Sequence, residues 1–178
     1  MLPDLLVPDL SVVICGTAVG EQSAQRGHYY AGRGNRFWQL LYESGLTPVR
    51  LRPEDDHRVI EFGIGLTDLA KSVAASSDIG LDSEFDVAAL AGKLERLRPH
   101  SLAFHGKRAA QAASRHTGNG RGVRLGLQAW RVAGVRVFVL PSASASNRDT
   151  SRLEGKSSHV EWFEELASLV RQKPKSSQ

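Results

Sequence analysis

The 178-residue chain has little sulfur and no long apolar run. Its one cysteine, Cys15, can form neither an internal disulfide nor a cysteine-ligated metal cluster, which excludes disulfide-stapled secreted domains and zinc-finger-like modules. The longest apolar runs, such as 135–140, are far too short to cross a bilayer, and the N-terminus lacks the basic start of a signal peptide. We therefore expect a cytoplasmic protein without a membrane segment.

Hydrophobic residues form 41% of the chain, which is enough to bury a core. The length suits one domain, which we place at residues 1–172, and we expect 173–178 to be a disordered polar tail. The formal charge of +4 and the excess of arginine over lysine are compatible with a polyanionic partner, although a solvated basic face has the same composition. The basic residues gather in two stretches: Lys107, Arg108, Arg115, Arg121 and Arg124, then Arg148, Arg152 and Lys156.

Strand patterns alternate with amphipathic helix patterns along the chain. Apolar runs predict strands at 11–15, 64–69, 101–104 and 135–140, with hairpin strands at 123–127 and 130–132. Helices are predicted from Asn35 to Gly45, at 53–61, at 87–97 behind a Ser83-x-x-Asp86 capping box, at 107–115, and from Ser158 onwards. This order predicts an α/β fold, a three-layer α/β/α sandwich around a short, mostly parallel sheet. The loops after Ile14, Leu69, Phe104 and Leu140 should then converge on one cleft.

A glycine pair follows the first strand, in Gly16-Thr-Ala-Val-Gly20. By itself this is typical of a tight turn, because it lacks the Lys-Ser/Thr of a P-loop and the third glycine of a dinucleotide fingerprint. The next segment, Gly27 to Trp38, reads GHYYAGRGNRFW. It resembles the mismatch-specific uracil/thymine-DNA glycosylases, a branch of the uracil-DNA glycosylase superfamily, in which a G-x-N-P-G loop precedes a similar block that opens a helix.

The resemblance extends over nearly the whole chain, in six blocks that occur in the family's order. After Gly27–Trp38 they are Ser44–Leu46, Gly63–Asp68, Phe104–Lys107, Leu125–Gln128 and Leu140–Ser146. The resemblance implies a monomeric DNA-repair enzyme that flips uracil out of DNA and hydrolyses its N-glycosidic bond, leaving an abasic site, without a metal or other cofactor. Lys107 is the only lysine in a matched active-site block, and it opens a helix, so a Schiff-base lyase step is not expected.

The resemblance also implies roles for individual residues. Tyr30 matches the aromatic platform under the flipped base, with Tyr29 and His28 beside it and His105 in another base-pocket block. Backbone N–H groups of the loop from Thr17 would stabilise the departing base. The segment 141–148 matches the loop that fills the gap left by the flipped nucleotide, and Arg148 is the candidate wedge. The residues expected to contact DNA are Asn35, Lys107, Ser142, Ser144, Ser146, Asn147 and Arg148.

One departure from the family pattern concerns the chemistry. The family's first motif has an asparagine that positions the attacking water, whereas this chain has Ala18, whose methyl group cannot orient water. Asp68 is the best replacement, as a pocket carboxylate that accepts from uracil, activates water or stabilises a cationic sugar, although it could instead cap a helix. His28 and His105 are weaker candidates, and Glu21 and Gln22 are further ones.

Two other function classes fit parts of the pattern. A protein that has the base pocket but no water-positioning asparagine could recognise uracil or abasic sites in DNA without cutting. A nucleotide-binding α/β protein would use Gly16 to Gly20 as a phosphate loop, but it would have no role for the block from Asn35 to Trp38.

Overall fold

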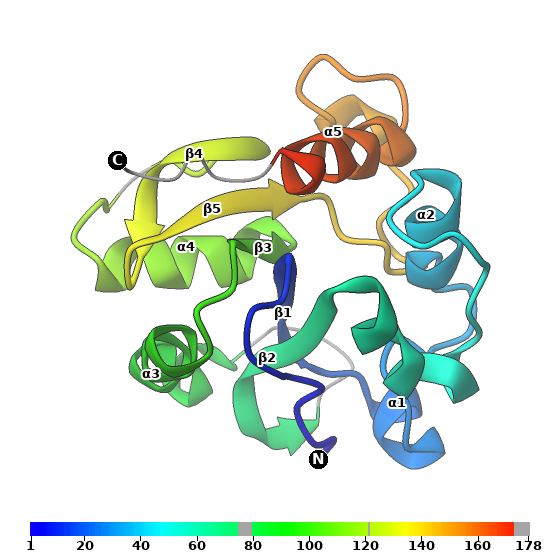
Figure 1. The fold of residues 1–178 in the computed structure, drawn as a ribbon, viewed down its shortest axis with the longest axis horizontal. Coiled ribbons are helices and arrows are strands. Elements are labelled where there is room, and N and C mark those ends of the chain that lie inside the picture. The colour runs from blue at the N-terminus through cyan, green and yellow to red at the C-terminus, as the bar shows by residue number, and fades with distance from the viewer. Residues whose placement is uncertain (75–79, 121, 173–178) are drawn as a thin grey trace.

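The computed structural model describes residues 1–74, 80–120 and 122–172, and the expected tail at 173–178 lies outside them. A five-stranded sheet of order β2-β1-β3-β5-β4 forms the centre of the molecule (Figure 1). The elements are β1 (Val12–Val19), α1 (Glu21–Arg26), α2 (Phe37–Glu43), η1 (Pro53–Phe62), β2 (Ile64–Ala74), η2 (Asp82–Glu84), α3 (Val87–Leu97), β3 (Ser101–His105), α4 (Lys107–His116), β4 (Gly126–Val132), β5 (Val135–Leu140), η3 (Thr150–Arg152) and α5 (His159–Arg171).

The sheet is covered by helices on both faces. Strands β2, β1, β3 and β5 are mutually parallel, and only β4 runs antiparallel, in a hairpin with β5. On one face α5 packs on β4 and β5 and against α2, while α4 packs on β1, β3 and β5 and against α3 on the other (Figure 1). The predicted α/β/α sandwich is therefore confirmed. No helix within the described ranges is long and apolar enough to span a membrane.

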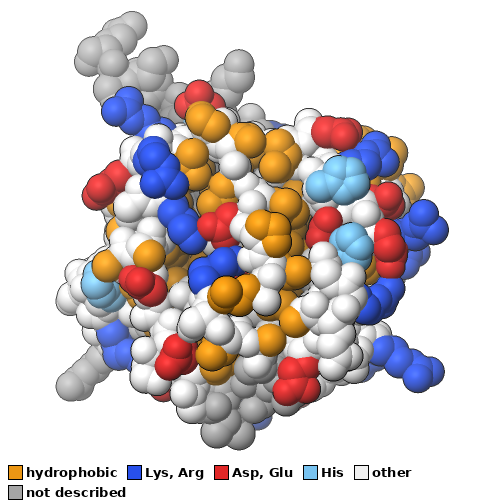
Figure 2. Space-filling view, turned by 90° about the horizontal axis from the view of Figure 1, so that it is seen from below, with side chains coloured by type: hydrophobic (Ala, Val, Ile, Leu, Met, Phe, Trp, Pro, Cys, Tyr) orange, Lys and Arg blue, Asp and Glu red, His pale blue; other side chains and the backbone are white. Residues whose placement is uncertain are grey.

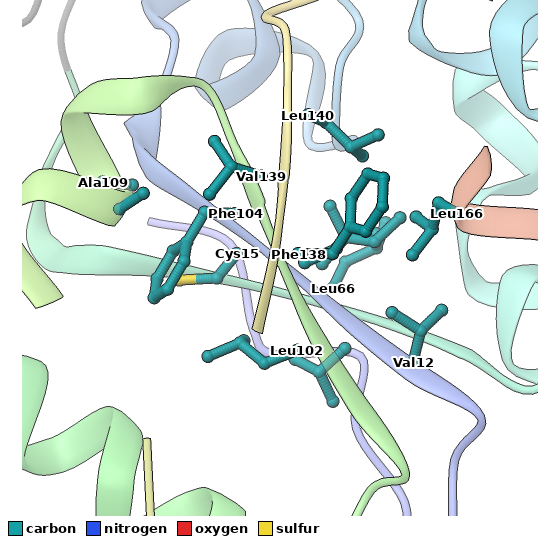
Figure 3. Packing of buried hydrophobic residues seen from close by; sticks show 14 of the residues in the cluster. Val12, Cys15, Leu66, Leu102, Phe104, Ala109, Phe138, Val139, Leu140 and Leu166 are labelled. Carbon is teal, nitrogen blue, oxygen red and sulfur yellow. The ribbon is translucent and has the colours of Figure 1, made fainter. Parts of the chain in front are cut away.

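The core lies between the sheet and these helices because successive strand residues point to opposite faces. Figure 3 shows Phe104 beside Cys15 and Ala109 toward α4, whereas Phe138 and Leu140 point toward Leu166 of α5. All six side chains are completely or almost completely removed from solvent. Burying each large apolar side chain stabilises the fold by roughly 1.5–3 kcal/mol, so the strands make a rigid base for the residues at their ends.

The first strand is longer than its apolar run predicts. The pattern places its end at Cys15 and a loop from Thr17 to Gly34, but β1 continues to Val19 and the short helix α1 follows. Ala18 pairs with Ala70, which is possible because β2 also runs on to Ala74 rather than ending at Leu69. Pairing between two strands adds these residues to the sheet although neither segment is strongly apolar by itself. The predicted tight turn at Gly16 was therefore wrong.

Two further local predictions were also wrong. The helix at Val87–Leu97 is capped by Asp86, whose Oδ1 accepts a hydrogen bond from Ala89 N–H, so Ser83 is not its cap. In place of the two hairpin strands predicted at 123–127 and 130–132, the structure has the single strand β4 (Gly126–Val132), and 123–125 lie outside it. Its hairpin partner is β5, through a two-residue turn at Ala133 and Gly134, both with positive φ, as this type of tight hairpin requires.

Candidate active site

A cavity of about 890 Å³ opens at the carboxyl ends of the parallel strands. The chain leaves β1 toward β2 on one side, whereas β3 lies on the other side, so β1 and β3 flank the topological switch point of the sheet. Pairing of β1 with β3 ends at Cys15 and Phe104, and beyond it β1 pairs with β2 alone. The divergence of these strands places the cavity where α/β folds bind their ligands.

Most of the residues singled out from the sequence line this cavity. They are Thr17, Ala18, Tyr29, Tyr30, Asn35, Asp68, His105, Lys107, Ser142, Ser144, Ser146 and Asn147. Glu21 and Gln22 line it as well. The segments after Ile14, Phe104 and Leu140 meet at the cavity as predicted, whereas the loop predicted after Leu69 does not, because β2 continues to Ala74 and contributes Asp68 from within the strand.

His28 and Arg148 do not belong to the cavity lining. The His28 ring lies against the carboxyl of Asp56, with Nδ1 3.4 Å from Oδ1, and it directly follows Gly27, the C-cap of α1. Arg148 lies over Gly34, and its Nε donates to the carbonyl of Ala145. These two predicted site residues thus lie outside the cavity lining, and their catalytic and wedge roles stay predictions.

Aromatic rings form one wall of the cavity. The ring of Tyr30 stacks on that of Phe37, with centroids 3.7 Å apart, and the His105 ring meets the edge of both. Asn35 holds the start of α2 in place, since its Oδ1 accepts a hydrogen bond from Phe37 N–H. Phe37 itself is fully buried, so it fixes the plane of Tyr30 from behind. The arrangement supports a flat aromatic surface at the cavity.

Tyr29 makes structural contacts that support this aromatic wall. Its ring is almost fully buried, its backbone N–H donates to Asp56, and its carbonyl accepts from the Trp38 indole. Its hydroxyl donates to the carbonyl of Pro3 and lies 3.2 Å from Lys71 Nζ. Burial raises the pKa of Tyr29, so the phenol remains neutral. These contacts tie the segment before Phe37 to the N-terminal residues.

Asp68 lies within β2, on the floor of the cavity, and is 6% exposed. It is in the middle of a strand, opposite Gly16, so the alternative role as a helix cap is wrong. Among the described residues its Oδ2 has no hydrogen-bond partner, and the same holds for the buried hydroxyl of Tyr30. Both groups lie within 4 Å of the point where a Cβ on Gly16 would be. Such groups are costly to bury, which indicates that a polar ligand or water completes their bonding.

Burial raises the pKa of Asp68 to about 7. Lys71 and Lys93 lower the pKa of this carboxyl, and Asp4 raises it. These three charges form a cluster in which Asp4 is 2.9 Å from Lys71 and 2.7 Å from Lys93. Asp68 can therefore take up or release a proton near neutral pH, as a general acid or base requires.

His105 connects the end of β3 to the serine-rich segment 141–148. Its Nε2 accepts a hydrogen bond from Ala143 N–H, which fixes the neutral tautomer with the proton on Nδ1. Burial lowers the pKa of His105 to about 4, so the ring carries no charge at neutral pH. It acts here as a neutral wall of the cavity, and not as a cation.

Hydrogen bonds within the segment 141–148 stabilise its conformation. Asn147 donates to the carbonyl of Ser142, the hydroxyls of Ser144 and Ser146 lie 3.0 Å apart, and Ser144 Oγ accepts from Ser146 N–H. The carbonyl of Ala143 accepts from Arg36 N–H at the start of α2. The hydroxyl groups thus stand on a pre-formed loop at the cavity edge, and none of these side chains is large and apolar.

Besides Arg33, three cations line the cavity, and each of these three has a carboxylate partner. Lys107 is 2.9 Å from Glu154, Arg108 is 3.1 Å from Asp82, and Arg152 is 3.6 Å from Asp149. We call Lys107, Arg108 and Arg152 the rim cations. They belong to the two basic stretches found in the sequence, and the fold brings these members of both stretches to one cavity.

The sequence reasoning missed the charged residues around these groups. Asp4, Lys71 and Lys93 surround the site of Asp68, and Glu154 pairs with Lys107, yet none was singled out. Lys71 lies close to Asp68 along β2, and this was a weak sequence signal for a contact. Asp4, Lys93 and Glu154 gave no such signal, because they come from distant segments of the chain. Within the described ranges, no three His, Cys, Asp or Glu side chains are grouped so that they could hold a metal ion.

Comparison with known proteins gives a consistent assignment. The model of the family "Uracil DNA glycosylase superfamily" matches residues 3–167. The fold is also similar to the solution NMR structure of a Methanosarcina acetivorans protein that is provisionally described as a uracil DNA glycosylase, with a TM-score of 0.61 and 23% sequence identity. That similarity covers 93% of this chain and 96% of the other, and at this identity it supports the shared fold alone. Because the family model spans most of the chain, the chain belongs to the uracil DNA glycosylase superfamily.

Proposed function

We propose that the protein is a monofunctional uracil-DNA glycosylase that acts as a monomer in the cytoplasm. It rotates uracil out of DNA into the cavity, hydrolyses the N-glycosidic bond and leaves an abasic site. The observation that carries this proposal is Asp68, a buried carboxyl with an unpartnered oxygen that lines the cavity of a chain belonging to the uracil DNA glycosylase superfamily. The sequence motifs of the chain resemble those of the mismatch-specific branch, except that Ala18 stands where the family pattern has an asparagine.

The cavity offers the contacts that a flipped base needs. Tyr30 supplies a stacking surface that Phe37 holds in place, and a base that has left the duplex must recover its lost stacking. The Tyr30 hydroxyl and Oδ2 of Asp68 supply polar atoms that have no hydrogen-bond partner among the described residues. The rim cations and the hydroxyls of Ser142, Ser144 and Ser146 lie at the opening, where DNA phosphates would pass.

Asp68 takes the place of the missing asparagine in the proposed reaction. As the N-glycosidic bond breaks, its electron pair goes to N1 of uracil, which leaves as an anion, and the sugar acquires positive charge. A water oxygen forms the new bond to C1′ and gives a proton to the Asp68 carboxylate. The ionised carboxylate also stabilises the cationic sugar by charge alone. The neutral His105 adds no positive charge that would oppose this sugar.

The decisive experiment is a base-release panel under single-turnover conditions. Labelled oligonucleotides carry uracil, thymine, hypoxanthine or xanthine, each in single strands and opposite each normal base. We expect free uracil and an alkali-labile abasic site from the uracil substrates, without strand cleavage by the enzyme itself. If folded protein releases no base from any substrate, the proposed hydrolysis is wrong.

Ala18 favours one second candidate, a non-cleaving or very slow protein that recognises uracil or abasic sites. A methyl group at this point of the cavity cannot orient a water molecule. This candidate requires selective binding of uracil or abasic DNA over undamaged DNA together with no base release. The panel, combined with a binding titration on the same oligonucleotides, separates the two functions.

A further inference from the structure

Glu154 holds the rim cation Lys107 in a two-sided contact. One carboxylate oxygen lies 2.9 Å from Lys107 Nζ, and the other accepts a hydrogen bond from the backbone N–H of Leu125. Both Lys107 and Leu125 line the cavity, while Glu154 comes from the turn after η3. The carboxylate therefore sits directly beside the opening through which a nucleotide would enter.

This contact is the most enclosed of the three rim pairs. The Glu154 side chain is 31% exposed, compared with 61% for Asp82 and 54% for Asp149. The backbone of Glu154 has a φ of 50°, in the left-handed region that non-glycine residues disfavour, and Gly155 follows with a φ of 91°. The hydrogen bond from Leu125 and the ion pair with Lys107 hold the residue in this conformation.

The position of Glu154 has a consequence for DNA binding. Lys107 can meet a DNA phosphate only if the phosphate displaces the carboxylate or approaches close to it, and like charges at short range repel. The pair is still partly exposed to solvent, and such an ion pair is weak enough to be displaced when other contacts favour the complex. Undamaged duplex DNA, which places no base in the cavity, has fewer such contacts than DNA with a flipped base.

We propose that Glu154 is a specificity-determining residue that occupies the place of a DNA phosphate on Lys107 and so weakens binding to undamaged DNA. The inference rests on the proposed function, because it takes the cavity to be the entry of a flipped nucleotide. Binding of a flipped base supplies the contacts that displace Glu154, and undamaged DNA does not. The negative charge thereby widens the difference in affinity between uracil-containing and undamaged DNA.

The substitution Glu154→Gln tests this proposal with little change of shape. The glutamine carbonyl can still accept from Leu125 N–H, while the amide nitrogen offers Lys107 no acceptor. Fluorescence anisotropy with undamaged duplex should show binding tightened by about threefold to tenfold at low salt, and a slope of log affinity against log salt that is steeper by about 1. Affinity for uracil-DNA should rise less, so the affinity ratio falls.

Two comparisons separate this effect from a general change of net charge. Glu61→Gln removes the same charge from a residue that pairs with Arg58 in η1 and does not line the cavity, and it should change affinity by less than twofold, roughly the limit expected for a distant surface charge. In a Lys107→Ala background, Glu154→Gln should have no further effect on undamaged DNA. Equal effects of Glu154→Gln and Glu61→Gln, or an undiminished effect without Lys107, would overturn the proposal.

The readout is independent of catalysis. Uracil release by the wild type together with unchanged undamaged-DNA affinity in Glu154→Gln would overturn this inference alone. If the wild type releases no base and does not prefer uracil-DNA, the proposed function fails, whatever the variant does. Thermal unfolding of each variant confirms that affinities are compared between folded proteins.

Discussion

A Cβ on residue 16 would lie 2.7 Å from Oδ1 of Asp68, closer than Cβ atoms approach other heavy atoms in proteins. Gly16 and Asp68 face each other across the paired strands β1 and β2. Glycine is therefore the residue that lets a carboxyl turn toward the cavity at this point. The φ of Gly16 is not in the left-handed region, so the requirement is for space and not for backbone freedom.

Gly16→Ala should displace the Asp68 carboxyl and lower uracil release by about tenfold to a hundredfold, since small misplacements of a reacting group are costly. Thermal unfolding and DNA binding should change far less than the rate. The matched control is Gly92→Ala in α3, where a Cβ has open space and alanine favours the helix by about 0.5–1 kcal/mol. Wild-type rates in Gly16→Ala would show that the geometry of Asp68 does not limit catalysis.

Asp68→Asn keeps the shape of the side chain but removes its charge and basicity. General-base assistance is worth about 10²–10⁴-fold, so single-turnover uracil release should fall by that factor while binding of uracil-DNA persists. The wild-type rate should rise with pH up to about 7 and then level off, because the carboxylate is the active form. This rise should be absent from the residual rate of the variant.

Ala18→Asn tests whether the missing asparagine and Asp68 serve the same step. Placed in the Asp68→Asn background, it should partly restore uracil release, because it returns the water-positioning amide of the family pattern to the cavity. The single variant Ala18→Asn is the control for general effects on folding. If the double variant releases uracil no faster than Asp68→Asn, Asp68 does not replace that asparagine.

Asp68 should also affect how stability depends on pH. Burial raises its pKa from 3.8 to about 7 in the folded state, so between these values the native protein binds more protons than the unfolded chain does. Stability contributed by this group is therefore lost as pH rises through that window, and the loss is complete above about pH 7. The melting temperature of Asp68→Asn minus that of the wild type should increase from pH 4 to pH 7. Above pH 7 this difference should stay constant. A constant difference would show that Asp68 has an ordinary pKa.

Tyr30→Ala should remove a stacking surface worth about 1–3 kcal/mol for a bound base. Uracil release should fall more than affinity for undamaged DNA, because the ring meets the base only after flipping. Tyr30→Phe keeps the ring on Phe37 and removes only the hydroxyl, so comparing it with Tyr30→Ala separates the loss of stacking from the loss of this polar group. Near-normal release by Tyr30→Ala would place the base elsewhere in the cavity.

Local sequence patterns were sufficient for much of the fold. The strand at Val135–Leu140 has the predicted bounds, and α5 begins directly after its cap Ser158, at the predicted start. Such elements can be predicted because their signals lie within a few neighbouring residues. The ends of β1 and β2 could not, since each strand is extended by pairing with the other, a contact between distant parts of the chain.

The same distinction holds for the site. The sequence alone singled out Tyr30, Asp68 and His105, because these residue types lie in recognisable blocks at expected strand ends. Only the tertiary structure decided that Asp68 is buried opposite Gly16, that Asp4 and Lys93 help to set its pKa, and that Glu154 reaches Lys107. His28, equally prominent in its motif, was turned toward Asp56 instead. Burial, charge proximity and pKa depend on atoms brought together by packing, and no local pattern in the sequence carries that information.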